Sequence, residues 1–127
     1  MPEKILEGEL LENRVIMWGI EGVSLYDESG YGKPLPEEPP DRLALELIEA
    51  TYLLEKGKIK VVTKTGKKRK FLEFAELMKL STEQVNQFHP QFIVYRDLRE
   101  RGYLVKTGFK FGAAFRVYER GVKLVRG

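Results

Sequence analysis

The order of elements is clearest in residues 94–118, which read VYRDLRERGYLVKTGFKFGAAFRVY. The first part has a helical pattern that ends at Gly102, because glycine readily adopts the left-handed conformation that terminates helices. Apolar residues then flank residues 107–108 (Thr-Gly) on both sides, which predicts two strands separated by a turn. This stretch therefore predicts a helix–strand–strand unit.

The helix of this unit extends upstream. Pro90 suits the first position of a helix that runs to Arg101, and residues 81–84 (STEQ) have the spacing of a capping box. Its buried face is predicted from apolar residues at helical spacing, which are Val85, Phe88, Phe92, Tyr95 and Leu98.

The N-terminal part of the chain predicts strands, a short helix and a loop. Residues 7–18 alternate loosely between polar and apolar types, which predicts one strand or a hairpin that turns at Glu12 and Asn13. Residues 19–27 predict a short helix. Residues 29–40 hold two glycines and four prolines, so we expect an extended loop there.

A helix is also predicted after this loop. Asp41 stands in the position of an N-cap, and Gly57 supplies a C-terminal stop. The residues at helical spacing between them are Leu43, Leu47, Ala50, Thr51 and Leu54. A strand hairpin around residues 65–66 (Thr-Gly) and a brief helix over residues 73–80 follow.

These elements together predict an α+β fold, mixed α/β in its parts. The chain has 127 residues, of which 43% are hydrophobic and 32% charged, enough for one compact domain or two small lobes. The pattern changes near residues 81–90. We therefore expect one lobe over residues 1–84 and the start of a second over residues 85–127.

Composition excludes several classes of site. The chain has no cysteine, which excludes a disulfide framework, a cysteine nucleophile and thiolate metal ligands. His89 is its single histidine, so a zinc site built by the protein alone is not expected. An Asp/Glu site for a hard cation stays open, and no cofactor is predicted.

Neither a membrane span nor a secretion signal is indicated by the sequence. Its apolar runs are far shorter than the roughly 20 residues that a spanning helix needs. The N-terminus lacks the basic, apolar and small-residue pattern of a signal peptide. We therefore expect a cytoplasmic protein.

The net charge of +3 conceals a strong asymmetry. Residues 1–55 contain 4 Lys/Arg and 13 Asp/Glu, a net charge of −9, whereas residues 56–127 contain 18 and 6, a net charge of +12. The basic part is expected to attract a polyanion, with nucleic acid the leading candidate.

Within that part, the run of residues 56–70 holds eight Lys/Arg and no acid. Two interpretations stay open: outward lysines that protect an exposed sheet edge, which we favour, or a direct contact with RNA. The arginines of the later helix, Arg96, Arg99 and Arg101, alternate with acids and favour local ion pairs over phosphate contacts. His89 favours a helix-cap or lobe contact over acid–base work. From periodicity alone, Tyr118 is a half-exposed strand tyrosine.

Residues 94–118 closely resemble the core of archaeal tRNA-splicing endonucleases. The resemblance lies in the order helix, Arg-Gly-Tyr, Val-Lys-Thr-Gly, Phe-Gly and Phe-Arg-Val-Tyr. Residues 31–34 (YGKP) and 49–54 (EATYLL) also resemble the N-terminal lobe of that family. The resemblance therefore covers nearly the whole chain.

The resemblance implies an assembly of subunits or repeats that cuts precursor tRNA at bulge–helix–bulge intron junctions. The expected products carry a 2′,3′-cyclic phosphate and a 5′-hydroxyl, and no metal is needed. In this family a tyrosine helps to remove the 2′-hydroxyl proton, a histidine protonates the leaving oxygen, and a lysine stabilises the transition state.

Tyr118 matches the catalytic tyrosine of the family. A tyrosine with a pKa near 10 is a poor base at neutral pH, so its site must favour deprotonation. The histidine of the family follows its tyrosine, whereas His89 precedes Tyr118, and Lys123 comes too early to match the lysine. We therefore expect an incomplete chain, inactive by itself: a truncated chain, part of a longer enzyme, or a piece that another chain complements.

The predicted partners are precursor tRNA and further endonuclease subunits, in a homo-oligomer or a hetero-oligomer. The alternative is a non-catalytic structural subunit, or an RNA-binding module, of the same assembly. The predicted RNA-binding residues are Lys67, Lys68, Arg69, Lys110 and Arg116.

Overall fold

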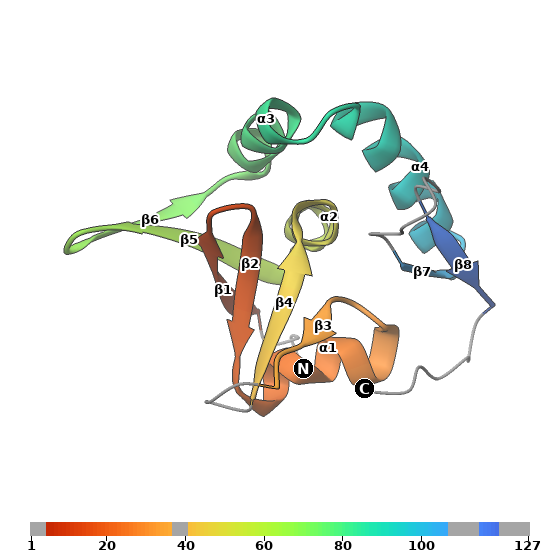
Figure 1. Ribbon diagram of the computed structural model, residues 1–127, viewed down its shortest axis with the longest axis horizontal. Coiled ribbons are helices and arrows are strands. Elements are labelled where there is room, and N and C mark those ends of the chain that lie inside the picture. The colour runs from red at the N-terminus through yellow and green to blue at the C-terminus, as the bar shows by residue number, and fades with distance from the viewer. Residues whose placement is uncertain (1–4, 37–40, 107–114, 120–127) are drawn as a thin grey trace.

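A computed structural model describes residues 5–36, 41–106 and 115–119 (Figure 1). Its strands form a six-stranded mixed sheet and a separate two-stranded ribbon, and helices α1 to α4 pack around them. This arrangement confirms the predicted α+β class.

The N-terminal hairpin consists of β1 (Leu6–Leu11) and β2 (Arg14–Trp18), paired antiparallel. Glu12, in its turn, has a φ of 58°, in the left-handed region. The predicted turn is therefore confirmed, with a hairpin rather than one strand. Helix α1 (Gly19–Ser29) follows directly, and the described part of the proline-containing loop contributes the two-residue strand β3 (Lys33–Pro34).

The helix predicted from Asp41 begins later. Residues after the loop first form β4 (Arg42–Glu46), and α2 (Leu47–Glu55) starts only after it. In β4, Leu43 and Leu45 are fully buried and alternate with more exposed neighbours, the two-residue period of a strand. Pairing with β2 on one side and β3 on the other satisfies the backbone of β4, which local sequence spacing did not reveal.

The predicted hairpin around residues 65–66 is confirmed as β5 (Ile59–Thr65) and β6 (Lys68–Leu72). The strand order of the sheet is β3-β4-β2-β1-β5-β6, so β6 lies at one edge. Only the β1–β5 pair is parallel, and it covers the first four residues of β5. The far end of the hairpin therefore projects beyond the sheet (Figure 1).

The C-terminal part contains α3 (Phe74–Gln84), α4 (Phe88–Glu100), β7 (Leu104–Lys106) and β8 (Arg116–Tyr118). Residues 81–84 form the last turn of α3 instead of capping the next helix, because Ser81 is buried within α3. Helix α4 begins two residues before Pro90, at the point where Gln87 adopts a left-handed φ of 59°.

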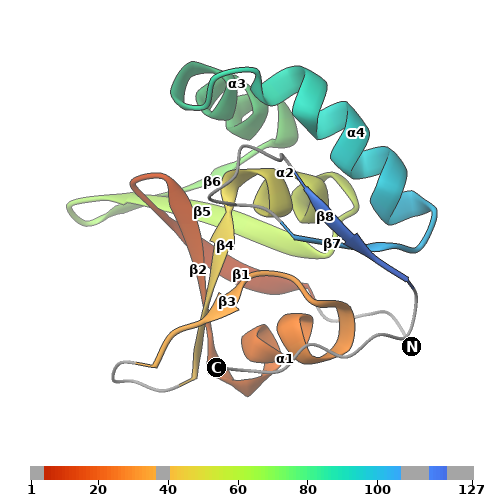
Figure 2. The same cartoon turned by 45° about the vertical axis from the view of Figure 1, so that its right-hand side comes forward.

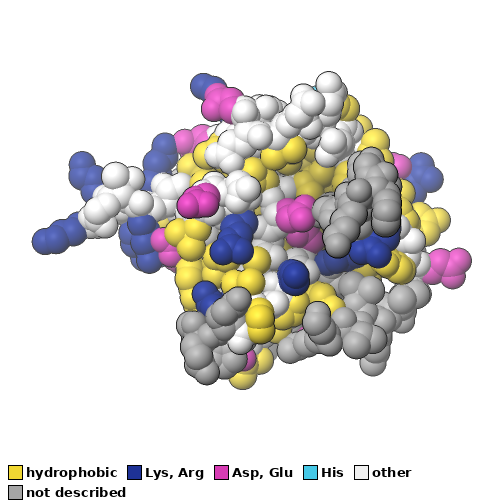
Figure 3. Space-filling view, in the orientation of Figure 1, with side chains coloured by type: hydrophobic (Ala, Val, Ile, Leu, Met, Phe, Trp, Pro, Cys, Tyr) yellow, Lys and Arg dark blue, Asp and Glu magenta, His cyan; other side chains and the backbone are white. Residues whose placement is uncertain are grey.

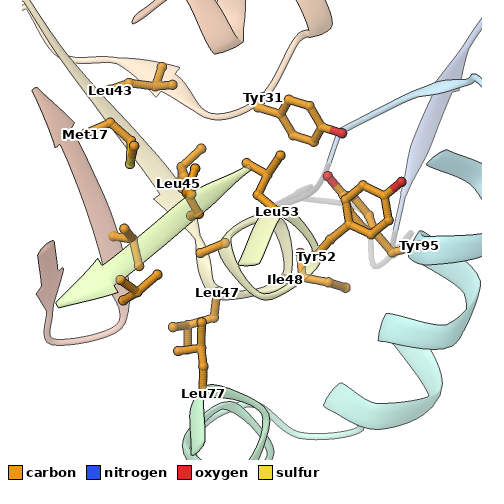
Figure 4. Close-up of a cluster of buried hydrophobic side chains, with 14 of the residues drawn as sticks. Met17, Tyr31, Leu43, Leu45, Leu47, Ile48, Tyr52, Leu53, Leu77 and Tyr95 are labelled. Carbon is orange, nitrogen blue, oxygen red and sulfur yellow. The ribbon is translucent and has the colours of Figure 1, made fainter. Parts of the chain in front are cut away.

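Helix α2 lies between the sheet and the α3–α4 layer (Figure 2). Seven of its nine residues are buried. One hydrophobic cluster joins Leu43, Leu45 and Leu53 with Leu77 of α3 and with Phe92 and Tyr95 of α4 (Figure 4). This cluster includes residues on both sides of residue 84, and the proposed division into two lobes stays a prediction.

Among the helices that the structure describes, none combines the length and the apolar character that crossing a membrane requires.

Candidate functional site

Strand β8 carries two of the predicted site residues, Arg116 and Tyr118. In their antiparallel register, Tyr118 pairs with Leu104 and Arg116 pairs with Lys106. Paired residues lie on the same face of a ribbon, as do alternate residues along one strand. Tyr118, Arg116 and Lys106 therefore share one face.

Tyr118 is half-buried and Arg116 is exposed. The half-exposed strand position that the periodicity predicted for Tyr118 is thus observed. Phe115 contacts the main core instead, with its ring centroid 5.7 Å from that of Tyr95. The predicted RNA contact Lys110 lies outside the described residues, as do Phe109 and Lys123.

The face that carries Tyr118 is anchored on the loop between α1 and β3. Lys106 Nζ donates hydrogen bonds to the carbonyl oxygens of Gly30 and Gly32, each at 2.8 Å. A Cβ placed on Gly30 would lie only 2.7 Å from the side chain of Leu104. The ribbon therefore packs closely against the backbone of this loop.

A buried carboxylate lies behind this contact. Glu49 of α2 is 2% exposed, and its Oε2 accepts the Gly32 N–H at 2.7 Å while its Oε1 accepts the Glu46 N–H at 2.9 Å. Lys106 Nζ lies 4.0 Å from Oε2. Burial raises the pKa of Glu49, and the nearby Lys106 charge and the two amides oppose that rise. Burial lowers the pKa of Lys106, and the nearby Glu49 carboxylate opposes that decrease. Both groups are therefore held in place at a desolvation cost.

Arg99 of α4 links the end of α1 to strand β7. Its guanidinium carbon lies 3.8 Å from the ring centroid of Tyr31. Its nitrogens donate to the carbonyl oxygens of Ser29 at 2.8 Å and Val105 at 3.4 Å, and to the Tyr95 hydroxyl at 3.2 Å. Burial raises the pKa of Tyr31 to about 12, with Arg99 opposing. We call Glu49, Lys106, Arg99 and Tyr31 the polar junction.

Two further tyrosines lie beside the polar junction (Figure 4). Tyr52 of α2 and Tyr95 of α4 meet edge to face, with centroids 5.8 Å apart. Burial raises the pKa of Tyr52 and raises that of Tyr95 well above its ordinary value. These phenols therefore stay neutral at neutral pH.

The arginines of α4 differ in their partners. Arg101 pairs with Asp97 one turn away at 3.1 Å, which confirms the predicted local ion pair. Arg96 instead pairs with Glu55 of α2 at 2.9 Å, and Arg99 belongs to the polar junction. The local prediction was wrong for these two because tertiary packing places other acceptors within their reach.

The remaining predicted RNA contacts lie elsewhere. Lys67 is in the turn of the β5–β6 hairpin, and Lys68 and Arg69 lie on β6, all exposed. Figures 1 and 2 show this hairpin at the end of the molecule away from β8. The structure therefore does not bring these residues to Tyr118. Their position on an edge strand agrees with the edge-protection interpretation, and an RNA contact stays a prediction.

Lys and Arg side chains gather over the projecting hairpin (Figure 3). We call residues 59–72 the basic hairpin. Arg69 pairs with Glu7 of β1, Lys64 with Glu9 of β1 at 3.7 Å, and Lys70 with Glu76 of α3 at 2.6 Å. The hydrogen bond with Glu76 raises the pKa of Lys70.

His89 lies in the first turn of α4, where it is exposed. Gln87 is the N-cap residue, so the helix cap predicted for His89 was wrong, and the alternative, a lobe contact, stays a prediction. Within residues 5–36, 41–106 and 115–119, no group of three or more His, Asp or Glu side chains is placed to hold a metal ion.

Sequence reasoning missed the polar junction. Glu49 and Lys106 are 57 positions apart, and no local pattern distinguishes Arg99 from the other two arginines of its helix. One signal was available: Glu49 stands within the apolar stretch LIEATYLL (residues 47–54), where a charged residue needs a buried partner.

Two family models and several curated relatives match this chain. The family model for the N-terminal domain of tRNA intron endonuclease matches residues 6–75, and that for its catalytic C-terminal domain matches residues 88–127. The chain is 50% identical over 96 residues to a tRNA-splicing endonuclease of Pyrococcus horikoshii, covering 76% of this chain and 52% of that protein. It is 47% identical over 98 residues to one of Thermococcus gammatolerans, covering 77% and 54%.

A third relative aligns over more of the chain. The tRNA-splicing endonuclease of Pyrococcus abyssi is 38% identical over 122 residues, which cover 95% of this chain and 67% of that protein. The chain spans about half the length of the first two relatives. The chain belongs to the tRNA intron endonuclease family.

Proposed function

We propose that this chain takes part in cleaving precursor tRNA at bulge–helix–bulge intron junctions, as a tRNA-intron lyase with Tyr118 as its catalytic tyrosine. The observation that carries the proposal is the position of Tyr118 on β8, half-buried and on one face with Arg116 and Lys106. The names of the relatives support the same activity.

In the proposed reaction, the 2′-hydroxyl of the RNA attacks the adjacent phosphate. The bond from phosphorus to the 5′-oxygen breaks, which leaves a 2′,3′-cyclic phosphate and a 5′-hydroxyl. Tyr118 would accept the 2′-hydroxyl proton, and the exposed Arg116 on the same face would attract the phosphate. The proton donor and the catalytic cation have no match among these 127 residues, so we expect no cleavage by the chain alone.

The test is cleavage of a bulge–helix–bulge RNA, with the chain alone and with a full-length archaeal tRNA-splicing endonuclease whose own tyrosine is replaced by phenylalanine. We expect cyclic-phosphate products only in the mixture. Tyr118→Phe should abolish them without weakening RNA binding. Wild-type rates in the Tyr118→Phe mixture would contradict the assignment.

The second candidate is a structural or RNA-binding subunit without a catalytic residue. It is favoured by the basic hairpin, which concentrates positive charge (Figure 3) at the end of the molecule away from β8 (Figure 1). If an active partner complex gains RNA affinity from this chain whether or not Tyr118 is present, this second function is correct.

We further propose an oligomeric assembly in the cytoplasm, where precursor tRNA would meet it. Within the described residues β8 pairs with β7, and addition of a further strand is a common way in which such a ribbon joins another chain. Sedimentation analysis of the purified chain tests the assembly: a concentration-independent monomer would contradict it.

A further inference from the structure

Phe71 is an aromatic residue in an unusual place. It lies on the edge strand β6 directly after the cationic run of residues 67–70, and 48% of its surface is exposed. Charges on an edge strand prevent unwanted strand pairing, but an exposed phenyl ring does not serve that purpose. The ring therefore calls for a different explanation.

Two cations flank the ring of Phe71. Lys60 Nζ lies 5.6 Å and the guanidinium carbon of Arg69 lies 5.7 Å from its centroid. The register accounts for this arrangement, because Phe71 pairs with Val62, so Lys60, two residues before Val62 on β5, lies on the same face. Val62 itself is only 2% exposed, so the cross-strand neighbour of Phe71 is a buried residue.

The surroundings of the ring are suited to a polyanion. The basic hairpin contains six Lys/Arg and no Asp or Glu. Three of these cations pair with acids of neighbouring elements, and Arg69 remains 51% exposed in spite of its pair with Glu7. An exposed ring between cations is the arrangement with which proteins bind unpaired nucleotides, since any base can stack on an aromatic ring while Lys and Arg contact the backbone.

We propose that Phe71, with Lys60 and Arg69, forms a stacking site for an unpaired nucleotide of an RNA ligand. This inference rests on the proposed function, because the RNA ligand is the precursor tRNA named there, which contains unpaired bulge nucleotides. A base within a duplex keeps its faces stacked, so this site distinguishes unpaired from paired RNA. Because the basic hairpin lies away from β8, the site contributes to binding rather than to the chemical step (Figure 2).

The experiment measures fluorescence anisotropy of the whole chain with three labelled RNAs: a bulge–helix–bulge RNA, a fully paired duplex and a single-stranded oligoadenylate of about ten nucleotides. Phe71→Leu keeps apolar cover over Val62 and removes only the aromatic face. We expect it to weaken binding of both RNAs that have unpaired bases by about tenfold, with less than a twofold change for the duplex. Phe71→Tyr should bind all three like the wild type.

A second measurement detects the stacking itself. We expect 2-aminopurine, placed in the oligoadenylate, to lose fluorescence on binding to the wild type and to Phe71→Tyr, but not to Phe71→Leu. Lys60→Gln should lower the salt dependence of binding by somewhat less than one unit of slope. The matched control Lys79→Gln changes an exposed lysine of α3 and should leave the slope unchanged.

The outcomes separate this site from the proposed function. If no bulge–helix–bulge RNA is cleaved but oligoadenylate binding still depends on the ring, the stacking site stands and the proposed function fails. If Phe71→Leu binds both unpaired RNAs like the wild type, the stacking site is overturned. A Phe71→Leu effect on oligomeric state alone would also overturn it, because Phe71 would then contact protein.

Discussion

The polar junction and the basic hairpin each place an arginine against an aromatic ring, but they differ in burial. In the junction the Arg99 guanidinium lies 3.8 Å from the Tyr31 ring centroid; in the hairpin that of Arg69 lies 5.7 Å from the Phe71 centroid. The side chain of Lys106 is 19% exposed, whereas that of Arg69 is 51% exposed.

This difference in burial decides what each region can do. In the junction, the cations donate to backbone carbonyls of the loop after α1, so removing one group leaves others buried without partners. In the hairpin, water replaces any lost partner, and exposed ion pairs contribute little to stability. The junction therefore stabilises the fold, and the hairpin keeps its cations accessible to a ligand.

The largest effect is expected for Glu49→Leu. This change removes the buried carboxylate and leaves Lys106 without its counter-charge and the Gly32 N–H without its acceptor. We expect the free energy of unfolding to fall by about 3–5 kcal/mol, measured by urea denaturation followed by circular dichroism. The matched control is Glu7→Leu, which breaks the exposed pair with Arg69 and should cost about 0–1 kcal/mol. Equal losses in the two variants would contradict the comparison.

The next effect is expected for a glycine of the loop. Gly32 has a φ of +73°, and an added Cβ would lie 2.7 Å from the Ala44 carbonyl oxygen. Gly32→Ala should therefore cost about 2–3 kcal/mol, from backbone strain and a contact that cannot relax. Gly66 of the hairpin has a similar φ of +62° with nothing within 4 Å, so Gly66→Ala should cost only about 1 kcal/mol. Thermal unfolding of both variants measures the two losses. A larger loss for Gly66→Ala than for Gly32→Ala would contradict the prediction.

A pH dependence should follow from the raised pKa of Glu49. Its folded-state pKa lies above the ordinary 4.5, so the folded state holds the proton more tightly than the unfolded state. The part of the stability that comes from this pKa difference is present below pH 4.5 and is lost as pH rises through the folded-state pKa. Relative to Glu49→Gln, the free energy of unfolding of the wild type should fall by at most about 1.4 kcal/mol per pH unit in that window. Urea denaturation of both proteins from below pH 4.5 to neutrality tests this; a wild-type advantage that grows with pH would contradict it.

The smallest effect on stability is expected in the hairpin. Lys68→Gln changes an exposed residue of the edge strand. We expect its unfolding temperature to equal that of the wild type, while its RNA affinity decreases and becomes less sensitive to salt. A lower unfolding temperature with unchanged RNA affinity would assign Lys68 to the fold.

Local signals predicted the hairpins well. The turns at Glu12 and at residues 65–66 depend on neighbouring residues, so a short stretch contains the necessary information. The helix predicted from Asp41 failed because Leu43 fits both the helical spacing with Leu47 and a strand alternation with Leu45, and pairing with β2 and β3 selected the strand. Of the residues near the β7–β8 ribbon, Tyr118 and Arg116 were predicted from the sequence and their roles stay predictions, whereas Glu49 and Lys106 were not singled out.

The sequence by itself determined the α+β class, the family and the basic character of the C-terminal part. These properties depend on composition and on the order of short motifs, and both are visible without knowing which residues are in contact. Only the tertiary structure decided which cations are buried and which face the solvent. Burial depends on residues distant in sequence, such as Glu49 and Lys106, and the free energy of a charge changes sharply with its surroundings.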